Sequence, residues 1–260
     1  MTTEFATSSD GTRIAFSREG SGPVLVLVDG AMCYRDFGPA QPFTQELKGE
    51  FTVVAYDRRG RGESGDSSTY DVRLEIDDLR AVLDAVGGDA FVLGFSSGAG
   101  LAYRAAAVGV TMRKLVGYEA PWVGLRGGRD YVADLDALAA AGRGDKMVDY
   151  FMTKMIGAPF FMPLMFRLMG SNWRKLKATG PTIRYDARVM GGDFEVPAGE
   201  LAKIGVPTMV VWGSKAATEM AEGNRRVAAT IPGAQHRILD GQTHNVAPAA
   251  LHPVLTEFLA

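Results

Sequence analysis

The sequence has little of what disulfide scaffolds, metal proteins and nucleic-acid-binding proteins are built on. Its 260 residues include one cysteine, Cys33, and three histidines. A single cysteine excludes an intrachain disulfide framework, and no Cys/His cluster has metal-site spacing, so we expect neither a metal nor a cofactor. The formal net charge is −2, and the basic residues are dispersed apart from 58–61. The sequence therefore has no basic stripe of the kind that would indicate nucleic acid as a partner.

Long apolar runs are also missing. None approaches the length that spans a membrane, and the first residues lack the basic and then apolar order of a signal peptide. We therefore expect a cytoplasmic protein with a small-molecule substrate and no membrane partner, and a homodimer stays open. With 47% hydrophobic residues, the chain can bury one large core in a single domain that carries an insertion.

Predicted strands and helices alternate through most of the chain. An Asp10-Gly11 turn joins the first two strands as a hairpin. The later alternation predicts an α/β fold, with a parallel sheet covered by helices on both faces. The predicted strands are 4–8, 13–17, 24–28, 51–56, 90–93, 114–119, 208–212 and 236–239, and the predicted helices include 74–86, 99–108 and 217–229.

The alternation stops between Pro121 and Pro197. This segment has a helical pattern rich in methionine and aromatic residues, notably over 160–169. We predict a helical cap at 121–197, inserted into a core domain formed by 1–120 and 198–260. Most of these side chains pack the cap onto the core, while flexible methionines also offer an adaptable wall for an apolar or aromatic acyl substrate.

The stretch from Gly94 to Gly98 reads Gly-Phe-Ser-Ser-Gly between an apolar strand and an alanine-rich helix. A serine on so sharp a turn leaves no room for neighbouring side chains, which explains the two glycines. The helix places its positive dipole end beside the reacting atoms. The pattern predicts a nucleophile elbow, and its register selects Ser96 over Ser97.

Several motifs together resemble the α/β-hydrolase superfamily. They are the 29–31 turn, the Asp-Arg-Arg-Gly-Arg-Gly-Glu-Ser run at 57–64, the elbow at Ser96, the cap, and Gly-Gln-Thr-His at 241–244. The chain is most similar to small capped bacterial serine hydrolases of the esterase and cofactor-free haloperoxidase type. The resemblance covers essentially the whole chain, and it implies a mostly parallel, twisted sheet with an inserted helical cap.

The resemblance implies a catalytic base and an acid. His244, on the loop after the last strand, is the implied base. The family usually carries its acid in a Gly-x-x-Asp turn, which here reads Gly-Ser-Lys-Ala at 213–216. Some members take the acid from the end of the strand after the elbow helix, where Glu119 lies. Glu119 is our first choice, Glu219 is a second, and a site without an acid stays open.

The resemblance also implies an oxyanion hole of backbone N–H groups. One donor is the amide of Ser97. The other is the amide of Ala31, and the neighbouring Met32 is the alternative. Asp29 replaces the family's usual histidine. We expect its carboxylate to point away from the hole and to hold the loop through backbone hydrogen bonds.

Several further residues are candidates for the pocket or for loop structure. We expect 57–59 to brace a turn, with Arg59 as a weaker option for binding a substrate carboxylate. Cys33 is expected to border the pocket as a packing residue and not to act as a nucleophile. The predicted pocket residues are Met32, Tyr34, Trp122, Met162 and Phe166.

The predicted function is that of a serine hydrolase, carboxylesterase-like, which cleaves an ester, a lactone or an activated amide through an acyl-enzyme. Serine at the elbow argues against epoxide hydrolysis and dehalogenation, which use an aspartate there in this fold. Carbon–carbon bond hydrolysis and lyase chemistry remain open because the same residues serve them. The missing aspartate also leaves open a non-hydrolytic ligand-binding protein on this scaffold.

Overall fold

The computed structural model describes residues 2–168 and 170–260, so Met1 and Met169 lie outside it. A single eight-stranded sheet runs through the described chain in the order β1-β2-β4-β3-β5-β6-β7-β8. The strands are β1 Glu4–Thr7, β2 Arg13–Glu19, β3 Val24–Val28, β4 Thr52–Tyr56, β5 Ala90–Phe95, β6 Leu115–Tyr118, β7 Thr208–Gly213 and β8 Gln235–Leu239.

The sheet is antiparallel at one edge and parallel elsewhere. β1 pairs with β2, and β2 with β4, in antiparallel register, whereas β4, β3, β5, β6, β7 and β8 pair in parallel. The parallel arrangement explains why β3, β5 and β7 are almost wholly apolar, because strands covered on both faces have no solvent side. The predicted fold class is confirmed.

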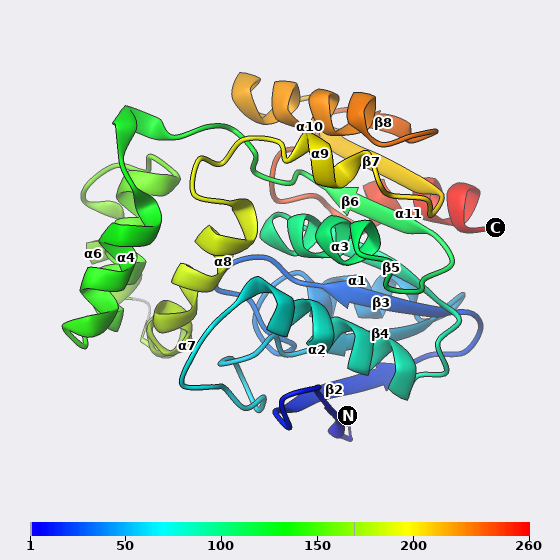
Figure 1. Ribbon diagram of the computed structural model, residues 1–260, viewed down its shortest axis with the longest axis horizontal. Helices are drawn as coiled ribbons and strands as arrows, with labels where there is room; N and C mark the ends of the chain where they lie inside the picture. Colours follow the sequence, from blue (N-terminus) through cyan, green and yellow to red (C-terminus); the bar gives the residue numbers. More distant parts are fainter. Residues whose placement is uncertain (1, 169) are drawn as a thin grey trace.

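Helices cover both faces of the sheet and form two cores. Residues of α2, α3, α8 and α10 contribute to one core, and residues of α1 and α11 to the other. Figure 1 shows α2 and α3 side by side across one face. The α-helices are α1 Ala40–Leu47, α2 Val72–Ala85, α3 Ser97–Ala107, α4 Tyr131–Ala140, α5 Gly144–Tyr150, α6 Met162–Arg167, α7 Ser171–Thr179, α8 Ile183–Met190, α9 Ala198–Leu201, α10 Thr218–Thr230 and α11 Pro248–Leu259.

The segment 121–197, the helical insertion, connects β6 to β7 and consists of helices and loops in its described part. In Figure 1 its helices α4, α6 and α7 lie beyond one end of the sheet, and α8 lies between them and α3. The helical character of this segment is as predicted, and the domain boundaries at 121 and 197 stay a prediction. No described helix combines the length and the apolar character that a membrane crossing requires.

Candidate active site

Ser96 lies on a strained turn between β5 and α3. Its backbone has φ 55° and ψ −126°, a conformation that L-residues rarely adopt. The flanking glycines make the turn sterically possible. A Cβ at Gly94 would lie 2.6 Å from Ala99 Cα, and one at Gly98 would lie 2.1 Å from the Val28 carbonyl oxygen. The structure thus gives Ser96 the strand-turn-helix setting that the motif predicts.

His244 contacts a buried carboxylate. Its Nδ1 lies 2.8 Å from Oε2 of Glu119, and Oε1 of Glu119 accepts the Gly213 N–H at 2.9 Å. The side chain of Glu119 is 0% exposed, so the imidazole offsets part of the cost of burying it. A hydrogen bond from Nδ1–H fixes the tautomer that leaves Nε2 free to accept a proton.

The arrangement favours Glu119 over Glu219 as the acid. Glu219 lies exposed in the first turn of α10, whereas Glu119 follows β6 directly and reaches the imidazole. The neighbouring Tyr118 hydroxyl donates to the Thr243 carbonyl at 2.6 Å, which anchors the loop that carries His244. The position of the family's usual aspartate is occupied by Ala216, and the carboxylate that contacts His244 follows the neighbouring strand β6.

The other two histidines have structural surroundings. His236 stacks on Trp212 with ring centroids 5.5 Å apart. His252 Nδ1 lies 2.9 Å from Glu46, and its Nε2 lies 3.2 Å from Glu50. Neither belongs to the set of residues that line the two cavities described next.

Two cavities meet at Ser96 and His244. The insertion-side cavity has a volume of about 380 Å³, and the α1-side cavity about 480 Å³. Both are also lined by Ala31. Phe151 and Ile156 line both cavities as well. The insertion-side cavity is further lined by Tyr131, Met155, Met190 and Phe194. The α1-side cavity is further lined by Cys33, Phe37, Pro42, Phe43 and Val246.

The loop after β3, residues 29–33, lies against the elbow. A Cβ at Gly30 would lie 2.9 Å from the Ser96 Cβ, so only glycine permits this approach. Ala31 follows it at the wall of both cavities, and Met32 has a φ of 61°. Ser97 is the first residue of α3, so its N–H is among the four without a helical acceptor. The structure thus brings both predicted donor residues to Ser96.

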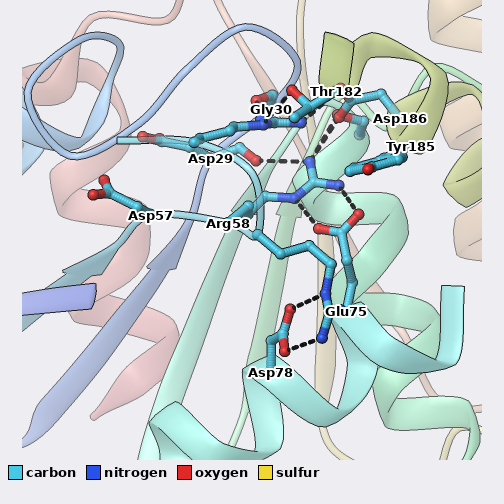
Figure 2. Close-up of polar contacts among 12 residues, drawn as sticks. Asp29, Gly30, Asp57, Arg58, Glu75, Asp78, Thr182, Tyr185 and Asp186 are labelled. Atoms are coloured by element: carbon cyan, nitrogen blue, oxygen red, sulfur yellow. Dashed lines mark hydrogen bonds and ion pairs between the residues drawn. The ribbon is translucent and has the colours of Figure 1, made fainter. Parts of the chain in front are cut away.

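A buried ion-pair network lies behind the elbow and the β3 loop (Figure 2). Asp186 Oδ1 accepts from Arg58 Nη1 and from the Ser97 hydroxyl, each at 2.7 Å, and Oδ2 accepts from Arg61 Nη2 at 2.7 Å. Burial opposes ionisation of Asp186, but Arg61, Arg58 and the Ser97 hydrogen bond outweigh it and lower the pKa of the carboxyl. Arg61 Nη1 donates to the Gly30 carbonyl at 2.7 Å.

Residues 57–59 brace a turn, as predicted. Asp57 accepts from the backbone N–H groups of Arg35 and Glu63, both at 2.8 Å. Arg59 is 0% exposed and pairs with Asp78 at 2.7 Å and with Asp10 at 3.0 Å. These partners occupy its guanidinium, so the weaker option that Arg59 binds a substrate carboxylate is wrong.

The expectation that the Asp29 carboxylate holds the loop through backbone hydrogen bonds is wrong. Both of its carboxylate oxygens are buried and have no hydrogen-bond partner among the described residues. Burial raises the pKa of Asp29 to about 7, an effect that Arg61 and Arg58 partly offset. The β3 loop is held instead by guanidinium groups, because Arg58 donates to the Asp29 carbonyl at 3.3 Å and Arg61 to that of Gly30.

The predicted pocket residues do not form the pocket. Of the described residues that line the two cavities, none is Met32, Tyr34, Trp122, Met162 or Phe166. Trp122 is 1% exposed, and its indole N–H donates to the Met190 carbonyl at 2.9 Å, so it packs in the core. Met162 and Phe166 lie half-buried on α6. Helices α4 and α8 and the segment 151–156 after α5 contribute other side chains to the cavities instead.

Cys33 lines the α1-side cavity, as expected. Burial raises the pKa of its thiol to about 12, so the sulfur is protonated at neutral pH and is a poor nucleophile. The structure therefore gives this residue a packing role beside Gly38, whose Cβ would lie 2.7 Å from the Cys33 Cβ.

Asp186 is the site residue that the sequence analysis missed. A signal for it exists in α8, where Ile183, Ala187 and Met190 occupy one helix face and are buried. Asp186 belongs to the same face at i+3 from Ile183. A carboxylate within such an apolar stripe indicates a buried ion pair. The sequence of the helix does not show which residues are its partners.

Comparison with known proteins agrees with the fold described above. The alpha/beta hydrolase family profile matches residues 24–252. An alpha/beta hydrolase from Sphaerobacter thermophilus has 42% identity and a TM-score of 0.90, covering 99% of this chain and 100% of that chain. An esterase from Rhodococcus sp. has 19% identity and a TM-score of 0.67, covering 99% and 97%. An enol-lactonase from Burkholderia xenovorans has 19% identity and a TM-score of 0.70, covering 98% and 99%. The chain belongs to the alpha/beta hydrolase family.

Proposed function

We propose that the protein is a serine hydrolase that cleaves a carboxylic ester, a lactone or an activated amide through an acyl-enzyme. The observation that carries this proposal is the 2.8 Å contact between His244 Nδ1 and the buried Glu119 carboxylate, beside cavities that Ser96 also lines. A histidine held this way by a carboxylate is equipped to act as the base for a serine hydroxyl. The 42% identity to a hydrolase supports the same class.

In the proposed mechanism Ser96 Oγ attacks the substrate carbonyl carbon, and His244 Nε2 takes the hydroxyl proton. Glu119 stabilises the resulting imidazolium through Nδ1–H. The carbonyl oxygen becomes an oxyanion, which the Ala31 and Ser97 amides hold. Collapse breaks the bond to the leaving group, which receives the proton from His244. Water then attacks the acyl-enzyme by the same steps, which releases the acid and frees Ser96.

The cavity walls support an apolar or aromatic acyl group. Tyr131, Phe151, Met155 and Phe194 give the insertion-side cavity an apolar wall. Of the charged residues that line this cavity, Lys215 and Glu219 are exposed, whereas Glu119 and Asp186 are buried and bound to His244 and Arg61 respectively. An apolar cavity with its polar groups concentrated at the reacting atoms is typical of sites that bind small apolar molecules.

A fluorophosphonate probe followed by mass spectrometry tests the mechanism. We expect an adduct on Ser96 in the wild type and none in Ser96→Ala. His244→Ala should lower the labelling rate by roughly a thousandfold or more, because it removes the base. Glu119→Gln should also lower the rate strongly, because the amide no longer holds His244 in the tautomer that leaves Nε2 free. His236→Ala is the matched control and should label like the wild type.

The same experiment separates the proposal from its alternatives. A folded wild type that does not react would favour a ligand-binding protein on this scaffold. Labelling at Ser96 without hydrolysis of any ester, lactone or activated amide in a panel would instead point to carbon–carbon bond hydrolysis or lyase chemistry by the same Ser96 and His244 pair.

A further inference from the structure

The two proposed oxyanion donors lie on different elements. Ala31 is on the loop after β3, and Ser97 is at the start of α3. Backbone donors stabilise an oxyanion only when they are fixed in advance, since any reorganisation during the reaction costs what the hydrogen bonds contribute. Something must therefore set the loop and the helix start relative to one another.

Arg58 Nη1 reaches both sides directly, because it donates to the Asp29 carbonyl at 3.3 Å and to the Ser97 hydroxyl at 3.4 Å. Asp186, from a third element, α8, binds this guanidinium and also connects the two sides. On the elbow side it accepts the hydroxyl of Ser97, whose own amide is a proposed donor, at 2.7 Å. On the loop side it holds Arg61 at 2.7 Å. Arg61 in turn donates to the carbonyls of Gly30 at 2.7 Å and Cys33 at 3.2 Å, which flank Ala31 and Met32.

The buried charges around Asp186 are paired with one another. Asp186 is 2% exposed, so its ionised form depends on its partners. Two guanidinium groups, Arg58 and Arg61, face two carboxylates, Asp186 and Glu75, and Glu75 binds Arg58 in a fork at 2.6 and 2.9 Å. Figure 2 shows Arg58 between these carboxylates. The fork geometry fixes directions as well as distances.

We propose that Asp186 is a positioning residue that sets the Ala31 and Ser97 amides for the oxyanion, by holding the Ser97 hydroxyl with one oxygen and Arg61 with the other. Asp186 also lines the insertion-side cavity, but its hydrogen bonds go to Arg58, Arg61 and Ser97 and not to Ser96 or His244. It acts through the start of α3 and through the carbonyls around Ala31. This inference rests on the proposed function, since it assigns a role within the same site.

The inference predicts a loss of kcat without a matching change in KM. Ser97→Ala removes the hydroxyl bound to Asp186 but leaves the Ser97 amide in place. We expect kcat for p-nitrophenyl acetate to fall on the order of tenfold, less than the loss of a whole donor. Ser97→Thr retains a hydroxyl and should recover most of this loss. Asp186→Asn should lower kcat further, and a thermal melt will show whether the variant folds.

A second readout isolates the oxyanion. A trifluoromethyl ketone adds to the active serine and places an anionic oxygen in the hole, so its inhibition constant should rise in Ser97→Ala by a factor similar to the fall in kcat. The matched control is Asp136→Asn. Asp136 pairs with Arg188 on the same helix as Asp186 but touches neither the elbow nor the β3 loop, so activity should stay unchanged.

The outcomes distinguish the inference from the function beneath it. A wild type that hydrolyses the ester and labels at Ser96, together with Ser97→Ala and folded Asp186→Asn variants of unchanged kcat and inhibitor affinity, would overturn the role of Asp186 and leave the hydrolase proposal standing. A wild type that neither labels nor hydrolyses would overturn the proposed function itself.

Discussion

Asp29 combines features that rarely occur together in one residue. The residue is 2% exposed, and its carboxylate lacks a hydrogen-bond partner within the described chain. Burying an unpaired charge is costly, so such a group takes up a proton instead. This explains why burial raises the pKa of Asp29 to about 7, while Asp186 nearby is held ionised by Arg58 and Arg61.

Asp29→Asn should change how stability depends on pH. The folded pKa is raised above the usual 3.8, so between about pH 4 and pH 7 the native state binds more protons than the unfolded chain. The wild type therefore loses stability as pH rises through that window, and asparagine does not. Across this pH window, the free energy of unfolding of the variant relative to that of the wild type should therefore rise by about 3–4 kcal/mol.

Urea denaturation at intervals from pH 4 to pH 8 measures this difference. A constant offset from the amide cancels, because only the change with pH is compared. Asp36→Asn is the control, as Asp36 is an exposed aspartate close by in the chain, and its difference from the wild type should stay flat. A flat difference for Asp29→Asn as well would mean that the carboxylate has a partner in solution.

The residue scale also shows what the sequence could predict. Ser96 was predicted from the apolar strand before it and from its flanking glycines, whereas His244 and Glu119 were predicted from the family resemblance, and the structure brings His244 and Glu119 into contact. The pocket residues could not be read this way. Which side chains of the helical insertion face Ser96 depends on how each helix is rotated about its axis, and that is set by tertiary packing.

At the scale of elements, helix α2 begins with a side-chain cap one turn before Glu75, which belongs to the buried ion-pair network. The Asp71 carboxylate accepts the Arg73 N–H at 2.8 Å, which satisfies one of the helix's free donors. One turn later Glu75 binds Arg58. Asp71→Ala should therefore cost about 1 kcal/mol of the free energy of unfolding, and Asp71→Ser should cost less, because serine also caps.

Chemical denaturation of these variants is compared with Asp84→Ala. Asp84 is an exposed residue in the last turn of the same helix, where a negative charge opposes the helix dipole, so its loss should leave stability unchanged or slightly raised. If Asp71→Ala were no less stable than Asp84→Ala, the Asp71 cap would contribute nothing to the free energy of unfolding.

The elements themselves were predicted to within a few residues wherever a strand or helix has a clear period. The strand Val24–Val28 was predicted with its observed bounds, while α2 begins two residues before the predicted 74 because the cap was not recognised. Helix α1 was not predicted. It is eight residues long, contains Pro42 and has no side-chain cap, so its helical state depends on packing Phe43 and Leu47 against the sheet.

At the scale of the whole molecule, the reacting residues lie where two cavities of different origin meet. The insertion-side cavity has much of its wall from the helical insertion, and the α1-side cavity has most of its wall from α1 and the loops of the core, while Phe151 and Ile156 of the insertion line both. An ester has two parts on either side of its carbonyl, the acyl group and the leaving group. We expect the acyl group to occupy the insertion-side cavity, because its methionine and aromatic walls adapt to apolar groups.

Two substitutions test this assignment by narrowing one cavity each. Ala216 lines only the insertion-side cavity and Val246 only the α1-side cavity. For p-nitrophenyl benzoate against p-nitrophenyl acetate, which share a leaving group, Ala216→Phe should lower the ratio of kcat/KM values on the order of tenfold, the scale on which an apolar pocket discriminates by size.

Val246→Phe should instead change kcat/KM for both esters by a similar factor, since the group that it crowds is common to them. Deacylation gives an independent check, because the leaving group has departed by then, so only the substitution in the acyl cavity slows the hydrolysis of the acyl-enzyme. If Val246→Phe discriminated between the two acyl groups while Ala216→Phe did not, the acyl group would occupy the α1-side cavity and the insertion would select the leaving group.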